Sequence, residues 1–165
     1  MSISSERNSN GTIGLWVWLM PAAYAVHVAE EAFGGDGLMC WMAAGGGVDW
    51  SLAEFFGVNM AGLGMMCLTS WAARRWEAWR WPLVSGATIF IANGIWHAAI
   101  CVMTRSYVPG VLTGLLLYIT AGGFVMFRLR HMISPRLFII AIFIGMVIHA
   151  ATIWLVLRMP GFQMG

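Results

Sequence analysis

Long apolar stretches alternate with short polar segments along the whole chain. Five of the apolar stretches are long, and they cover residues 12–33, 51–73, 82–104, 108–127 and 137–158. A helix of roughly 20 apolar residues spans a hydrocarbon layer about 30 Å thick. Ser134-Pro135 interrupts the chain before the fifth stretch. The pattern predicts an all-α polytopic membrane helix bundle with five transmembrane helices, which form a single integral membrane domain over residues 1–165.

The composition agrees with a membrane protein and argues against several other classes. Hydrophobic residues make up 60% of the chain, charged residues make up 10%, and the mean hydropathy is +0.77. Ordinary soluble domains carry about 25% charged residues, so we expect most of this surface to face the lipid bilayer. A net charge of +2 provides no basic surface for nucleic acid. The cysteines Cys40, Cys67 and Cys101 have the spacing of neither a disulfide framework nor a zinc knuckle.

The arginines are distributed unevenly between the two sides that five crossings create. Arg105 and Arg158 fall on one side, and the other side holds Arg7, Arg74, Arg75, Arg80, Arg128, Arg130 and Arg136. Because positive residues stay in the cytoplasm, we expect a multi-pass protein of the cell (inner) membrane with its N-terminus cytoplasmic and its C-terminus outside. Ala23-Tyr24-Ala25 resembles a signal-peptidase site, and cleavage there would leave four spans.

Ionisable side chains inside the apolar stretches are the strongest functional signal in the sequence. Each costs about 2.5 to 3.5 kcal/mol at the centre of a membrane helix, so such groups are rare unless they are paired or functional. His27, Glu30 and Glu31 share one helical face because they are spaced i, i+3, i+4. Asn93 and His97 share a face of the third stretch in the same way. At about 1.5 Å of rise per residue, both groups fall in the outer half of the membrane, together with Glu54, Asn59 and His149.

The convergence of these side chains at one depth predicts a shared cavity that holds a metal ion. Neutral imidazoles and carboxylates suit a divalent metal such as Zn or Fe, and facing helices of a bundle can supply them. The predicted metal ligands are His27, Glu30, His97 and His149, and the predicted catalytic residues are Glu30, Glu31 and Asn93.

Structural roles compete with this interpretation. The cluster on the first stretch would also be stable as an interfacial group that reaches water at the helix end. The pair on the third stretch would also serve as hydrogen-bonding residues between helices. His149 stands alone on its stretch. Glu54 is typical of a first-turn residue that the helix dipole favours, and Asn59 is typical of a packing hydrogen bond.

Three motifs in order resemble a known family. They are His27-Val28-Ala29-Glu30-Glu31, Asn93-Gly94-Ile95-Trp96-His97 and Tyr107-Val108-Pro109-Gly110. With this order and spacing, residues 14–127 resemble the HXXEE family of bacterial integral membrane proteins. The resemblance implies an active site made of His27, Glu30, Glu31, Asn93 and His97, and it implies no particular reaction. His149 and Glu54 stand outside the resemblance and rest on their depth alone.

Hypotheses of different classes follow from this cluster. The first is an intramembrane metal-dependent enzyme, a hydrolase with Zn or an oxidoreductase with Fe, that acts on a lipid or other apolar substrate. In it, His27, His97 and His149 bind the metal. Glu30 or Glu31 completes the ligand set or acts as general base, and Asn93 orients the substrate or a ligand.

The second hypothesis is a small proton- or cation-coupled transporter or binding protein that uses the same cluster. Many transporters consist of two internal repeats, and this chain shows no such repeat. A second copy of the chain in a homo-oligomer would then take the place of the second repeat. A structural or haem-binding subunit with two histidine ligands is the third hypothesis.

Overall fold

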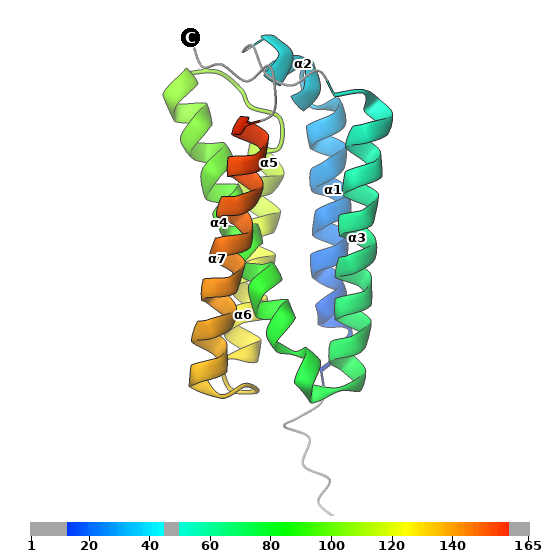
Figure 1. Ribbon diagram of the computed structural model, residues 1–165, viewed down its shortest axis with the longest axis vertical. Helices are drawn as coiled ribbons and strands as arrows, with labels where there is room; N and C mark the ends of the chain where they lie inside the picture. The colour runs from blue at the N-terminus through cyan, green and yellow to red at the C-terminus, as the bar shows by residue number, and fades with distance from the viewer. Residues whose placement is uncertain (1–12, 45–49, 159–165) are drawn as a thin grey trace, which may run out of the picture.

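The computed structural model describes residues 13–44 and 50–158, and these residues form helices and no strand. In chain order the helices are η2 (Leu15–Trp18), α1 (Leu19–Phe33), α2 (Leu38–Ala44), α3 (Leu52–Arg75), η3 (Glu77–Trp79), α4 (Trp81–Thr104), α5 (Val111–Thr113), η4 (Gly114–Tyr118), α6 (Ile119–Leu129) and α7 (Pro135–Arg158). Figure 1 shows the long helices running alongside one another as a bundle. The predicted all-α polytopic membrane bundle is confirmed. The predicted locations of the two chain ends concern residues outside the described ranges.

The number of spans differs from the prediction at the first apolar stretch. Four helical segments of the described chain are long and apolar enough to cross a membrane, namely Leu52–Arg75, Glu77–Thr104, Val111–Leu129 and Pro135–Leu155. In the stretch predicted at 12–33, the α-helix covers only 15 residues. Pro21 has no N–H to donate to the carbonyl of Val17, so the α-helix cannot continue regularly toward the N-terminus. The 3₁₀ turn η2 precedes it instead.

The first stretch nevertheless keeps the length of a membrane crossing. At about 2.0 Å per 3₁₀ residue and about 1.5 Å per α-helical residue, η2 and α1 together rise roughly 30 Å. The Val17 carbonyl accepts a hydrogen bond from the Ser70 hydroxyl of α3 at 3.3 Å. This bond ties the irregular start of the stretch to its neighbouring helix.

The stretch predicted at 108–127 is divided in the structure. It begins with the single turn α5, continues as the π-helical turn η4, and becomes regular at α6. π turns inside α-helices are frequent at functional sites. Here the π turn packs against both α1 and α4.

Helix α4 packs against α6 and α7, while α1 and α3 pair with each other (Figure 1). Its buried side chains join the core, and they include Leu83, Val84, Ala87 and Phe90. Gly145 of α7 lies directly against Ser85 of α4, whose hydroxyl donates to the Ala141 carbonyl at 2.8 Å. Small residues and hydrogen bonds of this kind hold membrane helices together, because lipid provides little hydrophobic driving force between them.

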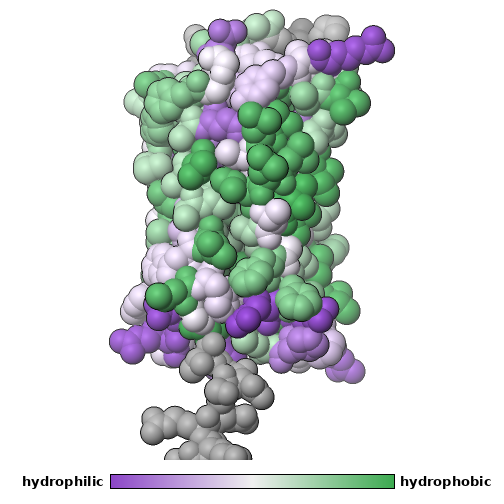
Figure 2. Space-filling view, turned by 180° about the vertical axis from the view of Figure 1, so that it is seen from behind, coloured by the Kyte–Doolittle hydropathy of each residue, from purple (hydrophilic) through white to green (hydrophobic). Residues whose placement is uncertain are grey.

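Polar segments gather at the two ends of the bundle. The arginine-rich segments 74–80 and 128–136 lie at one end, where α3 leads into α4 and α6 leads into α7 (Figure 1). The opposite end carries α2 and residues 105–110. Figure 2 shows a broad apolar band between the two polar ends. Together with the long apolar helices, this surface is that of a multi-pass membrane protein.

Candidate metal centre

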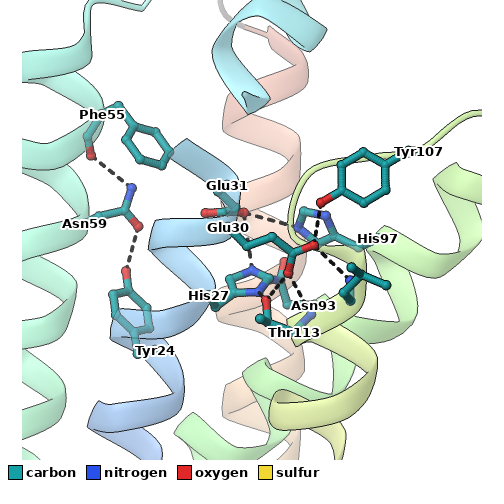
Figure 3. A network of polar contacts seen from close by, with 11 residues as sticks. Tyr24, His27, Glu30, Glu31, Phe55, Asn59, Asn93, His97, Tyr107 and Thr113 are labelled. Atoms are coloured by element: carbon teal, nitrogen blue, oxygen red, sulfur yellow. Dashed lines mark hydrogen bonds and ion pairs between the residues drawn. The ribbon is translucent and has the colours of Figure 1, made fainter. Parts of the chain in front are cut away.

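Two helices supply the centre of the site. Helix α1 carries His27 and Glu31 one turn apart, and α4 carries Asn93 and His97 with the same spacing. Residues four apart lie on one face of a helix, so each helix directs two polar side chains to the same side. Figure 3 shows these side chains converging between the helices, toward the end of the bundle that carries α2.

Glu31 lies between two imidazoles. Its Oε1 atom is 3.3 Å from Nε2 of His27 and 3.3 Å from Nε2 of His97. The two rings are nearly perpendicular, with centroids 5.2 Å apart. His27 and His97 are only 2% and 5% exposed. One donor atom from each of the three residues lies within 4.8 Å of the others, which is a spacing that allows them to share a metal ion.

Contacts on both nitrogens and on one face fix the orientation of His27. Its Nδ1 lies 2.8 Å from Oγ1 of Thr113, and its Nε2 lies 3.1 Å from Nδ2 of Asn93. The ring of Tyr118 lies beside the imidazole with 4.0 Å between centroids. Phe90 stacks on Tyr118 at 3.8 Å. The π turn that carries Tyr118 therefore contributes directly to the site.

Glu30 points toward the segment 107–113 rather than into the group formed by the imidazoles (Figure 3). Its Oε1 accepts from the Tyr107 hydroxyl at 2.7 Å and from the backbone N–H of Leu112 at 3.0 Å. Its Oε2 accepts from the backbone N–H of Thr113 at 2.7 Å and also from the Thr113 hydroxyl. These four donors satisfy both oxygens of the carboxylate.

Tyr107 holds Glu30 from the segment between α4 and α5. Partial removal from water, the hydrogen bond to Glu30 and the negative charge of that carboxylate raise the pKa of Tyr107 to about 12. The hydroxyl therefore remains protonated near neutral pH and continues to donate. Gly34 leaves room for it, since a Cβ at that position would lie 2.6 Å from the hydroxyl oxygen.

Gly110 packs against the rings of both histidines. Its φ of +95° lies in the left-handed region that glycine adopts readily. A Cβ at this position would lie 2.8 Å from Cε1 of His97 and 3.0 Å from Cε1 of His27. The last residue of the Tyr107-Val108-Pro109-Gly110 motif therefore starts α5 and also closes one side of the site.

His97 keeps one nitrogen without a partner in the described part of the chain. Its Nδ1 is buried and makes no hydrogen bond there. A buried polar atom left unsatisfied costs about 1 to 3 kcal/mol. This nitrogen belongs to the ring that contacts Glu31, and it is available to a further polar group.

The structure brings together only some of the residues that the sequence predicted for the site. His27, Glu31 and His97 meet, and Asn93 joins them through His27. Glu30, predicted as a metal ligand, is held by residues 107–113 instead. His149, also predicted as a ligand, is half-buried on α7 and near enough to His97 for an electrostatic interaction, but it is not part of the three-residue group.

The two polar residues of α3 that the sequence placed at the depth of the site form hydrogen bonds away from the three-residue group. Glu54 forms a capping box with Ser51 at the start of the helix, as its interpretation as a first-turn residue predicted. Asn59 accepts a hydrogen bond from the Tyr24 hydroxyl at 3.0 Å and donates to the Phe55 carbonyl at 2.9 Å. The bond with Tyr24 joins α3 to α1, and the bond with Phe55 lies within α3.

Thr113 and Tyr118 contact His27, although neither was predicted from the sequence as a site residue. Thr113 follows the Tyr107-Val108-Pro109-Gly110 motif by three residues and places a hydroxyl in an apolar stretch. This position could have indicated that Thr113 belongs to the site. Nothing in the sequence indicated a site role for Tyr118, because an aromatic residue in a membrane helix is more often part of the core.

Comparisons with known proteins agree with the motifs. No curated protein and no solved structure matches the chain. A family model described as a protein of unknown function with HXXEE motif matches residues 18–125. The matched range includes His27, Glu31, Asn93, His97 and Thr113. Because the match covers more than half of the sequence and every residue that contacts the centre of the site, this chain belongs to the HXXEE family.

Proposed function

We propose that this protein is an intramembrane metal-dependent enzyme that acts on a lipid or other apolar substrate. The observation that carries the proposal is the convergence of His27, Glu31 and His97, whose donor atoms lie within 4.8 Å of one another. Two imidazoles and one carboxylate are the ligand set of several catalytic zinc sites and of many non-haem iron oxygenases. Sites with three protein ligands leave a position for water or substrate.

Electrostatics favour a cation at this position. Glu31 presents one carboxylate oxygen to two imidazole nitrogens at the same distance. A nitrogen without a proton directs a lone pair at that oxygen, and the two lone pairs repel each other. A divalent cation would relieve the repulsion at both imidazoles together, and the carboxylate would offset part of its charge.

The surrounding residues would orient the reactants and exclude water. A bound Zn or Fe would supply Lewis-acid or redox chemistry at the open position. The Asn93 amide reaches Nε2 of His27, so it lies where it can hydrogen-bond a substrate oxygen at the centre. Tyr118 covers the His27 ring, with Phe90 stacked on Tyr118, and Gly110 packs against both imidazoles.

The substrate would bind in a pocket at the same end of the bundle as this centre. Its volume is about 600 Å³, and its lining includes Asp36, Trp41, Tyr107 and Pro109. Pro109 adjoins Gly110, which lies against both histidines. None of the described residues that line the pocket is basic, whereas anionic headgroups are usually held by Arg or Lys. We therefore expect a substrate with an uncharged or cationic polar group and an apolar tail that stays in the lipid.

The arginine-rich end of the bundle fits the cytoplasmic side of the cell (inner) membrane. The pocket and the three ligands would then lie in the outer half of the membrane. A substrate would enter from the outer leaflet.

Metal analysis of the purified full-length protein tests the proposal. We expect an equimolar amount of Zn or Fe, and we expect Glu31→Gln and His97→Ala to lose it because each variant removes a ligand. His131→Ala is the matched control, because His131 is hydrogen-bonded to Arg130 at the opposite end of the bundle. Folded protein that binds neither metal would contradict the proposal. If such protein conducted protons across liposome membranes, the same buried Glu and His groups would instead support a transporter.

A further inference from the structure

The Thr113 hydroxyl joins His27 to Glu30. Its oxygen lies 2.8 Å from Nδ1 of His27, and it also forms a short hydrogen bond with Oε2 of Glu30. His27 and Glu30 are three residues apart on α1, whereas Thr113 comes from α5, 86 positions along the chain from His27. One hydroxyl thus connects an imidazole and a carboxylate of the H-x-x-E-E motif from a different element.

The hydrogens available in this group set the direction of each bond. Three N–H and O–H groups besides the Thr113 hydroxyl point at the oxygens of Glu30, and they belong to Tyr107, Leu112 and Thr113. This arrangement suits an ionised carboxylate, which accepts hydrogen bonds and cannot donate. The single hydrogen of the Thr113 hydroxyl is therefore donated to Glu30. Nδ1–H of His27 must then be the donor to Thr113.

The direction of this bond determines the tautomer of His27. A neutral imidazole carries one hydrogen on its two nitrogens, so an Nδ1–H leaves a lone pair on Nε2. That lone pair faces the Asn93 amide at 3.1 Å and Glu31 at 3.3 Å. Asn93 donates where Thr113 accepts, so these two contacts favour the same tautomer, whereas the Glu31 carboxylate accepts and favours a proton on Nε2.

We propose that Thr113 and Glu30 are positioning residues that hold His27 in the Nδ1–H tautomer, with its Nε2 lone pair directed at the centre of the site. The two glutamates of the motif then have different tasks. Glu31 faces both imidazoles, and Glu30 orients one of them through Thr113. An outer partner of this kind commonly fixes the tautomer of a metal-binding histidine. The consequence for metal binding rests on the proposed function, whereas the tautomer itself does not.

Nitrogen NMR of full-length protein labelled with ¹⁵N-histidine tests the tautomer without any metal. The His27 signals are assigned by their loss in His27→Gln. We expect the Nδ1–H tautomer in the native protein and in Thr113→Ser, which keeps the hydroxyl. Thr113→Val is expected to populate the Nε2–H tautomer, because Nδ1 loses its acceptor. Thr152→Val is the matched control, since the Thr152 hydroxyl donates to the Ile148 carbonyl of α7.

Two NMR results would overturn the proposal. One is an Nε2–H tautomer of His27 in the native protein. The other is an unchanged Nδ1–H signal in folded Thr113→Val. If Thr113→Val does not fold, Glu30→Leu serves as the second variant, because it removes the acceptor that takes the Thr113 hydrogen and should also shift the tautomer.

Zinc titration separates this inference from the proposed function. Loss of an outer partner typically weakens metal affinity about 10- to 100-fold, and we expect this loss in Glu30→Leu and Thr113→Val. Glu31→Gln should lose more, because it removes a ligand. Equal zinc affinity of Glu30→Leu and native protein would contradict the positioning role of Glu30 without contradicting the metal site. A native protein that binds no zinc or iron would contradict the proposed function, while the NMR result would still decide the tautomer.

Discussion

Gly110 combines a left-handed backbone with direct contact to two buried imidazoles. We expect Gly110→Ala to lower the free energy of unfolding by at least roughly 1 to 2 kcal/mol, the cost of a left-handed conformation for a residue with a Cβ. The added Cβ would also lie 2.8 Å from Cε1 of His97, so this ring must move and metal affinity should fall. Thermal unfolding in detergent and zinc titration measure the two effects.

Gly123 provides the control for this substitution. It lies in α6, and a Cβ there would meet no atom within 4 Å. Alanine is favoured over glycine inside a helix by about 1 kcal/mol, so Gly123→Ala should keep or raise the stability. Equal stability and zinc affinity of the two variants would contradict the role assigned to Gly110.

The residues of the site differ in how far the sequence alone could identify them. The helical repeat and the shared depth predicted that His27, Glu31 and His97 converge, but they also included His149, which lies outside this group. The same repeat could not separate Glu30 from Glu31, because both lie on the face of His27. Their roles depend on residues 107–113, which tertiary packing brings against α1. Thr113 was missed for the same reason.

Helices α4 and α7 pack through small residues, and this contact holds the helix that carries His97 and Asn93. A Cβ on Gly145 would lie 2.5 Å from the Ser85 carbonyl oxygen and 2.8 Å from Cβ of Thr88. We expect Gly145→Ala to destabilise the bundle by about 1 to 3 kcal/mol, the usual cost of overpacking. Gly64→Ala in α3 is the control, because a Cβ there meets nothing within 4 Å. Unfolding curves in one detergent compare the variants, and the same midpoint for both would contradict close packing of α4 on α7.

Length and hydropathy predicted the long helices but not their interruptions. The stretches at 51–73, 82–104 and 137–158 appear as α3, α4 and α7 with small shifts at their ends. The irregular start at η2 follows from Pro21, which was visible in the sequence. The π turn η4 has no comparable local signal. It packs against α1 and α4, and it places Tyr118 beside His27.

The orientation of the whole molecule determines which side of the membrane supplies the substrate. Asp36 lies at the end that carries the site, and Arg130 lies at the arginine-rich end. In a background without Cys40, Cys67 and Cys101, we expect Asp36→Cys to react with an impermeant thiol reagent added outside cells. Arg130→Cys should react only after the membrane is made permeable. The reverse pattern would place the site in the cytoplasmic half.

X-ray absorption spectroscopy of the metal-loaded protein tests the central claim most directly, because it reports which atoms bind the metal. With zinc, we predict two imidazole nitrogens and carboxylate or water oxygens at about 2.0 to 2.2 Å in the native protein, and loss of this zinc signal in His97→Ala. A sulfur neighbour at about 2.3 Å, or a spectrum that His97→Ala leaves unchanged, would contradict a centre made of His27, Glu31 and His97.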